Sequence, residues 1–201
     1  MAALMLQIPH ETARILHEVD VPGDKTPEDP HVTVMYLGSD VPVETIAEML
    51  PILYGVTSKT LPFSVSTKHV STFPPGKDGV PVIAQIESKA LHELNAALRS
   101  AFDGAGIPYD KKFPEFKPHT TLAYDPNHET HGQLSIDIPE LSWGAHELVL
   151  WGSDRGTGRL VVTFPFSFSA VKVASLRTGD QHSLRRAAVR LAAWKELHAF
   201  V

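Results

Sequence analysis

The chain has 201 residues, of which 43% are hydrophobic and 20% are charged, and its formal net charge is -5. This length suits one sizeable domain, or two small lobes that share one core. The negative charge argues against a general nucleic-acid coat protein, which needs a basic surface, but it allows a small nucleotide in one local pocket. The chain has no cysteine, which excludes disulfides, thiolate nucleophiles and cysteine-ligated metals.

The first twenty residues lack a basic segment followed by a long apolar core, and no later run approaches the length of a membrane span. We therefore expect a cytoplasmic protein with no membrane partner. In the first part of the chain, hydrophobic spacing predicts a strand over 3–8, a helix over 10–19, a loop over 21–30 and a helix over 43–54.

The middle of the chain continues the alternation of strands and helices. It predicts a strand over 61–73, a turn over 74–79, a strand over 80–87 and a helix over 88–102 with Ser88 as its N-cap. Further strands are predicted over 134–138, 147–151 and 159–168, and a helix from about Ser183. This pattern predicts a main domain over 1–172 and a C-terminal helical extension over 173–201.

One short motif occurs twice, as PHVTVMY over 30–36 and as PHTTLAY over 118–124. Each copy begins with proline and continues with β-branched and aromatic residues, which predicts a strand. Because successive side chains of a strand point to opposite faces, each histidine shares a face with the threonine two residues later. The same alternation places Tyr36 and Tyr124 on the other face, so we expect core packing rather than base stacking for them.

The elements around the two motifs are also repeated. A strand, a helix, a loop and a His-x-Thr strand follow one another over 3–37 and again over 80–124. Such an internal duplication predicts two pseudo-symmetric lobes whose His-x-Thr strands face one groove.

At these motifs the sequence resembles the two-histidine (2H) phosphoesterase superfamily, which includes the RNA 2′,3′-cyclic phosphodiesterases once called 2′-5′ RNA ligases. The resemblance covers roughly residues 3–170. It implies a bilobal α+β fold with two antiparallel sheets around a central groove, helices outside, and a C-terminal helix added here. It also implies that no metal or other cofactor is needed. The catalytic set that it implies is His31, Thr33, His119 and Thr121.

Histidine suits this chemistry because its reference pKa of about 6.5 lets it act as base or acid near neutral pH. Two histidines on opposite sides of one phosphorus supply both functions, and a threonine hydroxyl can donate to a non-bridging oxygen. We expect His31 as base and His119 as acid when a ribose 2′-hydroxyl attacks. The roles exchange when water opens a cyclic phosphate, and the sequence does not order them.

Basic residues alternate with aromatic ones in the loop before the second motif, as suits phosphate and base contacts. The candidates for substrate binding are Lys111, Lys112, Phe113, Phe116 and Lys117, and a merely solvated loop is an equal alternative. Weaker candidates are Lys68, His69, Ser71 and Thr72. His128 and His131 have a spacing that could bind a metal, but an exposed loop without further ligands is the favoured interpretation, so no metal site is predicted.

The favoured function is a metal-independent phosphodiesterase that acts on a nucleotide or short oligonucleotide. Its substrates would be RNA ends with 2′,3′-cyclic phosphates or 2′-5′ linkages. The alternative substrates are cyclic or 2′-5′ oligonucleotide immune messengers, as degraded by some phage relatives. Two other classes stay open, namely a nucleotide-binding module without turnover and an interaction role centred on the C-terminal helix. The oligomeric state is not predicted.

Overall fold

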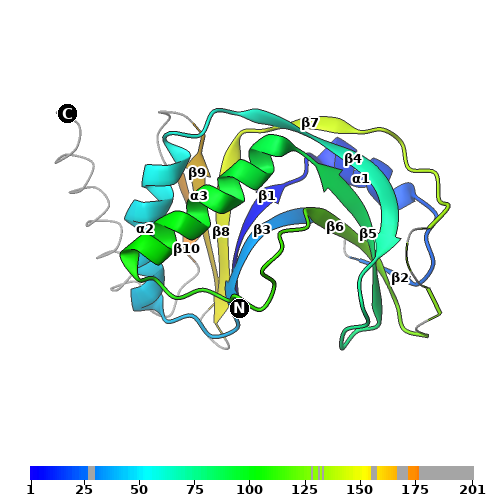
Figure 1. Cartoon of the computed structure of the whole chain (residues 1–201), viewed down its shortest axis with the longest axis horizontal. Coiled ribbons are helices and arrows are strands. Elements are labelled where there is room, and N and C mark those ends of the chain that lie inside the picture. The colour runs from blue at the N-terminus through cyan, green and yellow to red at the C-terminus, as the bar shows by residue number, and fades with distance from the viewer. Residues whose placement is uncertain are drawn as a thin grey trace.

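The computed structural model describes residues 1–26, 30–127, 129–130, 132, 134–154, 158–166 and 172–176. The strands form two antiparallel five-stranded sheets, which we call sheet A and sheet B (Figure 1). Sheet A contains, in spatial order, β10 (Lys172–Leu176), β9 (Gly158–Pro165), β8 (Glu147–Asp154), β1 (Ala2–Gln7) and β3 (His31–Gly38). Sheet B contains β2 (Asp24–Lys25), β6 (His119–Asp125), β5 (Val80–Glu87), β4 (Phe63–Thr72) and β7 (Ser142–Ala145).

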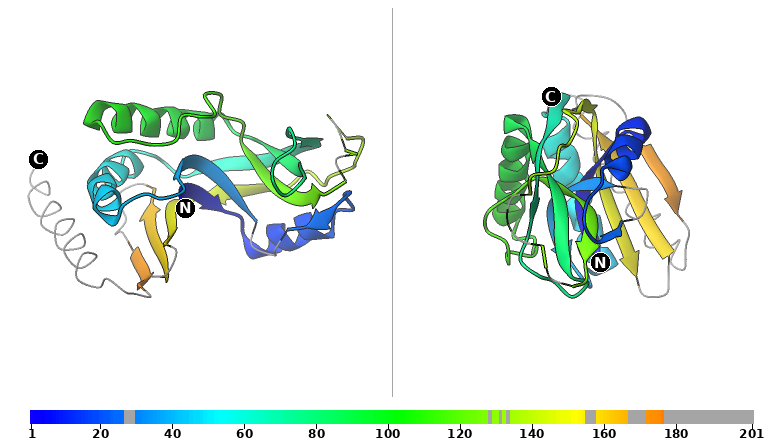
Figure 2. Two further views of the ribbon diagram at one scale, coloured as in Figure 1. Left: turned by 90° about the horizontal axis from the view of Figure 1, so that it is seen from below. Right: turned by 90° about the vertical axis from the view of Figure 1, so that its right-hand side faces the viewer.

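Within the described part of the chain, three helices accompany the sheets, namely α1 (His10–Glu18), α2 (Val43–Thr57) and α3 (Lys89–Ala105). Figures 1 and 2 show α2 and α3 beside sheet A and α1 beside sheet B. The helix of each duplicated unit therefore lies beside the sheet of the other unit. One cluster of buried side chains runs through both sheets and all three helices, so the two lobes share a core. The predicted α+β fold with two antiparallel sheets is confirmed.

Among the residues that the structure describes, the longest helix is α3, and it follows its sequence signals. Ser88 accepts a hydrogen bond from the backbone N–H of Leu91, as predicted for the N-cap. Leu91, Leu94 and Leu98 form the buried stripe, and the helix ends at Gly106, whose φ of 69° is left-handed. None of the helices in the described ranges is both long and apolar enough to cross a membrane.

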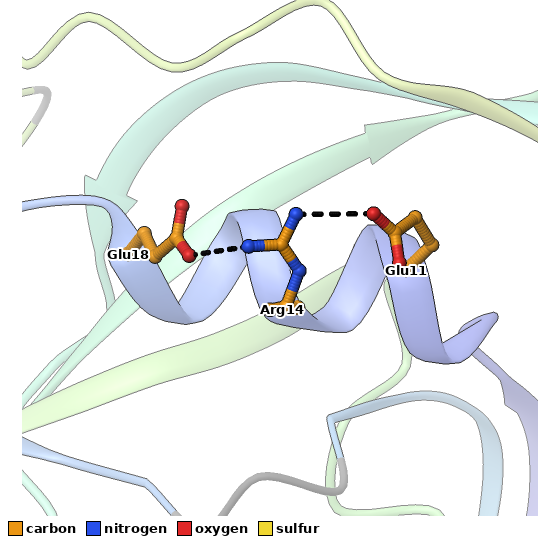
Figure 3. A network of polar contacts seen from close by, with 3 residues as sticks. All are labelled: Glu11, Arg14 and Glu18. Atoms are coloured by element: carbon orange, nitrogen blue, oxygen red, sulfur yellow. Dashed lines mark hydrogen bonds and ion pairs between the residues drawn. The ribbon is translucent and has the colours of Figure 1, made fainter.

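The outer face of α1 is polar and carries a small charge network. Arg14 donates to Glu11 at 3.0 Å and to Glu18 at 2.8 Å, one turn away on either side (Figure 3). All three side chains are more than half exposed, so these ion pairs support the helix only weakly. The buried residues Ala13 and Leu16 on the other side attach α1 to the core.

The sequence missed three strands and predicted one that does not form. The missed strands are β2, β7 and β10, of which β2 has two residues and β7 four, too few to show an alternating pattern. Residues 134–138 do not form a strand. Their alternating apolar side chains are half-buried and pack on the core, and the backbone N–H of Leu134 donates a hydrogen bond to the carbonyl oxygen of Val70. The predicted helix over 183–201 and the pair His128 and His131 lie outside the described residues.

Two glycines allow neighbouring chain segments to lie close to the end of β6. Gly23 has a φ of 94° and Gly79 a φ of 111°, values that side chains rarely permit. A Cβ at Gly23 would overlap the carbonyl of Tyr124, and one at Gly79 would overlap the carbonyl of Asp125. The two glycines therefore let β2 and β5 begin directly against β6.

Asp125 ends β6 and organises the turn that follows it. Its carboxylate is buried and accepts bonds from the Thr130 hydroxyl and from the backbone N–H groups of Asn127, Glu129 and Thr130, at 2.6 to 3.0 Å. These bonds, led by the Thr130 hydroxyl, lower the pKa of Asp125 below its ordinary value.

We expect Asp125→Asn to lower the Tm by several degrees at pH 7, because an amide cannot accept all four bonds. Since the pKa is lower in the folded chain than in the unfolded one, this stabilisation is present above the unfolded pKa and is lost as the pH falls through the folded pKa. The Tm difference should therefore shrink in strong acid, as thermal denaturation at several pH values would show. The control is Asp40→Asn at an exposed site. Equal Tm losses at pH 7 and in strong acid would contradict the assignment.

Candidate functional site

The two motif strands, β3 and β6, each begin with the motif histidine and contact one another between the sheets (Figure 1). β3 is the edge strand of sheet A, so no further strand of that sheet separates it from sheet B. His31 is exposed, and Thr33, His119 and Thr121 are half-buried. The structure therefore brings together the two strands that carry the predicted catalytic set.

A β-bulge interrupts β3 just after its His-x-Thr motif. Thr33 lies opposite Met5 and Met35 lies opposite Leu4, which leaves Val34 without a partner of its own. Val34 and Met35 are consequently both buried in the core. Beyond the bulge the alternation is shifted by one residue, so Tyr36 lies on the same face as Thr33.

The same bulge occurs at the equivalent residue of β6. Thr121 lies opposite Ile83 and Ala123 opposite Val82, so Leu122 has no partner of its own. Tyr124 therefore shares a face with Thr121 and His119. The prediction that Tyr36 and Tyr124 lie opposite the histidines was wrong, because strict alternation takes no account of a bulge.

We call the side of each sheet that carries its motif histidine the histidine face. On sheet A this face has an apolar floor, in which Tyr36 and Trp151 pack around the small side chain of Ala3. Trp151 is thus half-buried on the histidine face, whereas Trp143 is buried in the main core. Such a floor beside a histidine suits the flat, weakly polar face of a nucleobase.

The backbone fixes the tautomer of His119. Its Nδ1 lies 2.7 Å from the carbonyl oxygen of Lys117. A carbonyl can only accept, so Nδ1 carries the hydrogen and Nε2 keeps the lone pair of the neutral ring. The residue before the motif proline thereby leaves Nε2 of His119 available as a proton acceptor.

Phe73, just after β4, packs against His119. The two rings meet edge to face, with centroids 4.6 Å apart and an interplanar angle of 82°. β5 separates β4 from β6, so Phe73 reaches across it. Burial lowers the pKa of His119; the Lys117 carbonyl opposes this effect, and the charge of His31 adds to it. His119 is therefore mostly neutral at pH 7. Sequence patterns gave no signal for Phe73, because the contact depends on sheet curvature.

Replacing Phe73 with leucine should raise the pKa of His119 toward the ordinary value of about 6.5, because the smaller side chain admits water to the imidazole. An NMR titration of the imidazole signals would measure this pKa. Phe63→Leu is the matched control, since Phe63 stacks on Phe166 instead of on a histidine. A lower or unchanged pKa of His119 in Phe73→Leu would show that Phe73 does not desolvate the ring.

The predicted substrate-binding residues make mainly local contacts. Lys111 donates to Asp103 on α3 at 2.7 Å, and Phe116 packs on the core and against His92. Lys117 pairs with Glu115, and its carbonyl holds His119. Lys112 lies over the ring of Phe113, which is 65% exposed. Arg99 fixes this loop by donating to the carbonyls of Phe113 and Pro114.

The weaker candidates on β4 are divided by the register. Ser71 lies opposite Ile83 and so shares the histidine face with Thr121, whereas Thr72 lies opposite the core residue Val82 and donates to the Gly132 carbonyl. Lys68 pairs with Glu87 at 3.4 Å. Within the described ranges, no three side chains of metal-ligating type gather into a cluster.

Comparison with known families supplies the decisive observation. The family model described as "2′-5′ RNA ligase superfamily" matches residues 6–157, which include both motif strands and both bulges. The chain belongs to this superfamily. The resemblance to the 2H phosphoesterases is thereby confirmed.

Individual relatives agree with this assignment. The chain is 33% identical over 99 residues to an RNA 2′,3′-cyclic phosphodiesterase of Geobacillus stearothermophilus, a match that spans 48% of this chain and only 30% of that protein. The crystal structure of TT0787 from Thermus thermophilus has a TM-score of 0.64 at 20% identity, covering 84% of this chain and 99% of that one. E. coli LigT complexed with 3′-AMP has a TM-score of 0.55 at 18% identity, covering 87% and 98%. Because both identities are below 25%, these two structures support the fold of this chain and nothing beyond the fold.

Proposed function

We propose that this protein is a phosphodiesterase that opens 2′,3′-cyclic phosphates of ribonucleotides or short RNA ends, with two histidines and no metal ion. The observation that carries this proposal is the pair of His-x-Thr strands in contact, one histidine exposed and the other desolvated with a fixed tautomer. Two imidazoles in different protonation states are what an in-line displacement at phosphorus requires.

The burial of His119 supports one order of the two roles for hydrolysis, with His119 as base and His31 as acid. Nε2 of neutral His119 takes a proton from water while the water oxygen forms a bond to phosphorus. The bond from phosphorus to one ribose oxygen breaks, and its electron pair stays on that oxygen. His31, in its protonated form, gives this oxygen a proton. The products are a ribose phosphomonoester and a free ribose hydroxyl, and the reverse direction exchanges the two roles.

The threonines act on the charge that develops at phosphorus. Thr33 and Thr121 each lie two residues after a histidine and on the same face, so both hydroxyls can donate to non-bridging oxygens. The register places Tyr36 and Tyr124 on the same faces, farther along the strands from the histidines. We assign Tyr36, with Trp151, to contact with the base or ribose.

The loop before β6 remains our proposal for further substrate contacts. Of its residues, Lys112 and Phe113 are exposed and contact one another, so they are the best placed to meet a second phosphate and a second base. Lys111, Phe116 and Lys117 are proposed to hold this loop in place, through Asp103, the core and His119 respectively. The partner is therefore a nucleotide or short oligonucleotide, in keeping with the net charge of -5.

The test is turnover by the purified protein, in EDTA, of 2′,3′-cyclic nucleotides, 2′-5′ oligoadenylate, and cyclic di- and trinucleotides. We expect the 2′,3′-cyclic nucleotides to be opened, with kcat/KM rising on a pH limb below the ordinary histidine value of about 6.5, because His119 must be neutral. If the protein prefers a messenger oligonucleotide, that class of substrate would replace the 2′,3′-cyclic phosphates in the proposal. Binding without turnover, or activity that EDTA abolishes, would contradict the proposal.

A further inference from the structure

A glutamine lies directly opposite each catalytic histidine. In sheet A, Gln7 of β1 pairs with His31 of β3, and in sheet B, Gln85 of β5 pairs with His119 of β6. Residues paired in this way point to the same side of a sheet, so both glutamines belong to the histidine faces. Each half of the site therefore carries an imidazole, a hydroxyl and a carboxamide.

The two glutamines occupy equivalent places in the internal duplication. Each is followed by isoleucine, as Gln7-Ile8 and Gln85-Ile86, near the end of the strand that opens its unit. The spacing to the histidine differs between the units, 24 residues in one and 34 in the other, as the residue numbers show. The pairing is thus kept by the strand register and does not depend on the length of the connection.

Neither carboxamide forms a hydrogen bond to another described residue. Gln7 is exposed and Gln85 half-buried, and neither side chain has a hydrogen-bond partner in the part of the chain that the structure describes. Side chains directly opposite in an antiparallel pair have Cβ atoms about 4.5–5.5 Å apart. A glutamine amide at that distance can meet an oxygen atom that also contacts the neighbouring imidazole.

We propose that Gln7 and Gln85 are catalytic residues that bind the oxygens of the scissile phosphate and its attacking water. This inference rests on the proposed function. The amide N–H groups of both residues donate to the phosphate oxygens, which become more negative in the transition state. The amide oxygen of Gln85 accepts a hydrogen bond from the water whose proton His119 removes. A neutral amide can do both without adding a charge that would change the pKa of the imidazole.

The central variants are Gln7→Met and Gln85→Met, which keep the length of the side chain and remove its polar atoms. We expect each to lower kcat for a 2′,3′-cyclic nucleotide by roughly 10²-fold, the typical loss of one transition-state donor. The Tm should stay unchanged, because the amides support no other group. Glu48→Met, on the exposed face of α2, is the matched control and should behave as wild type.

Gln85→Glu supplies a readout that a structural role would not affect. A carboxylate opposite His119 should raise the pKa of the imidazole, and so shift the rising limb of the pH profile upward. The charge of His31 on β3 acts on this ring, Lys117 in the preceding loop contacts it through its backbone carbonyl, and the Lys68–Glu87 pair lies on the neighbouring strands β4 and β5. These groups are the same in wild type and variant, so they do not account for a shift.

The outcomes separate the two proposals. A wild-type protein that turns over no member of the panel would remove the proposed function, whatever the glutamine variants do. An active wild type with equally active Gln7→Met and Gln85→Met would overturn this inference alone. If a methionine variant is also less stable, Gln85→Glu decides, since an unshifted pH limb overturns the placement of Gln85 beside His119.

Discussion

His119→Ala is expected to lower kcat/KM for a 2′,3′-cyclic nucleotide by roughly 10²–10⁴-fold, and His31→Ala by a similar factor, because each variant loses one proton transfer. The two losses should differ in their pH dependence. Removing His119 deletes the rising limb, which reports the neutral base. Removing His31 deletes the falling limb, which reports the protonated acid. Steady-state kinetics across the pH range would measure both.

The double variant, which carries both His31→Ala and His119→Ala, adds a second check. When two residues act on one transition state, the losses of activity in their single variants are not additive in free energy. The loss in the double variant should be smaller than the product of the single losses. The control is His146→Ala, an exposed histidine between β7 and β8. Full activity in either single variant would contradict the two-histidine mechanism.

The second large effect concerns the hydroxyls. Thr33→Val and Thr121→Val keep the shape of the side chain and remove the donor, so each should lower kcat by roughly 10²–10³-fold with a smaller change in KM. Serine at either position should restore most of the activity. The control is Thr45→Val on α2, a half-buried threonine that belongs to neither motif strand. Losses confined to KM would show that the hydroxyls bind the ground state only.

The sequence predicted the main strands and helices, the duplication and the four motif residues, because these follow from local patterns. Strand alternation and helix spacing set the bounds of β5 and the N-cap of α3. The repeat placed both His-x-Thr strands in equivalent positions. The prediction that two such strands meet depended only on that symmetry, and β3 and β6 are in contact.

What the sequence did not predict depends on register and curvature. A bulge moves every later side chain to the other face, and nothing in Val34 or Leu122 marks one, so Tyr36 and Tyr124 were placed on the wrong side. Phe73 reaches His119 across an intervening strand, and the pairing of Gln85 with His119 joins residues 34 positions apart. Such contacts between distant residues become visible only when the sheets are assembled.

The central claim is that His119 is the base and His31 the acid in the opening of a cyclic phosphate. The most direct test uses a 2′,3′-cyclic nucleotide in which sulfur replaces the leaving ribose oxygen, because a thiolate departs without a proton. The account predicts that this substrate restores much of the activity lost in His31→Ala and none of that lost in His119→Ala. Rescue of His119→Ala instead, or equal rescue of both variants, would contradict it.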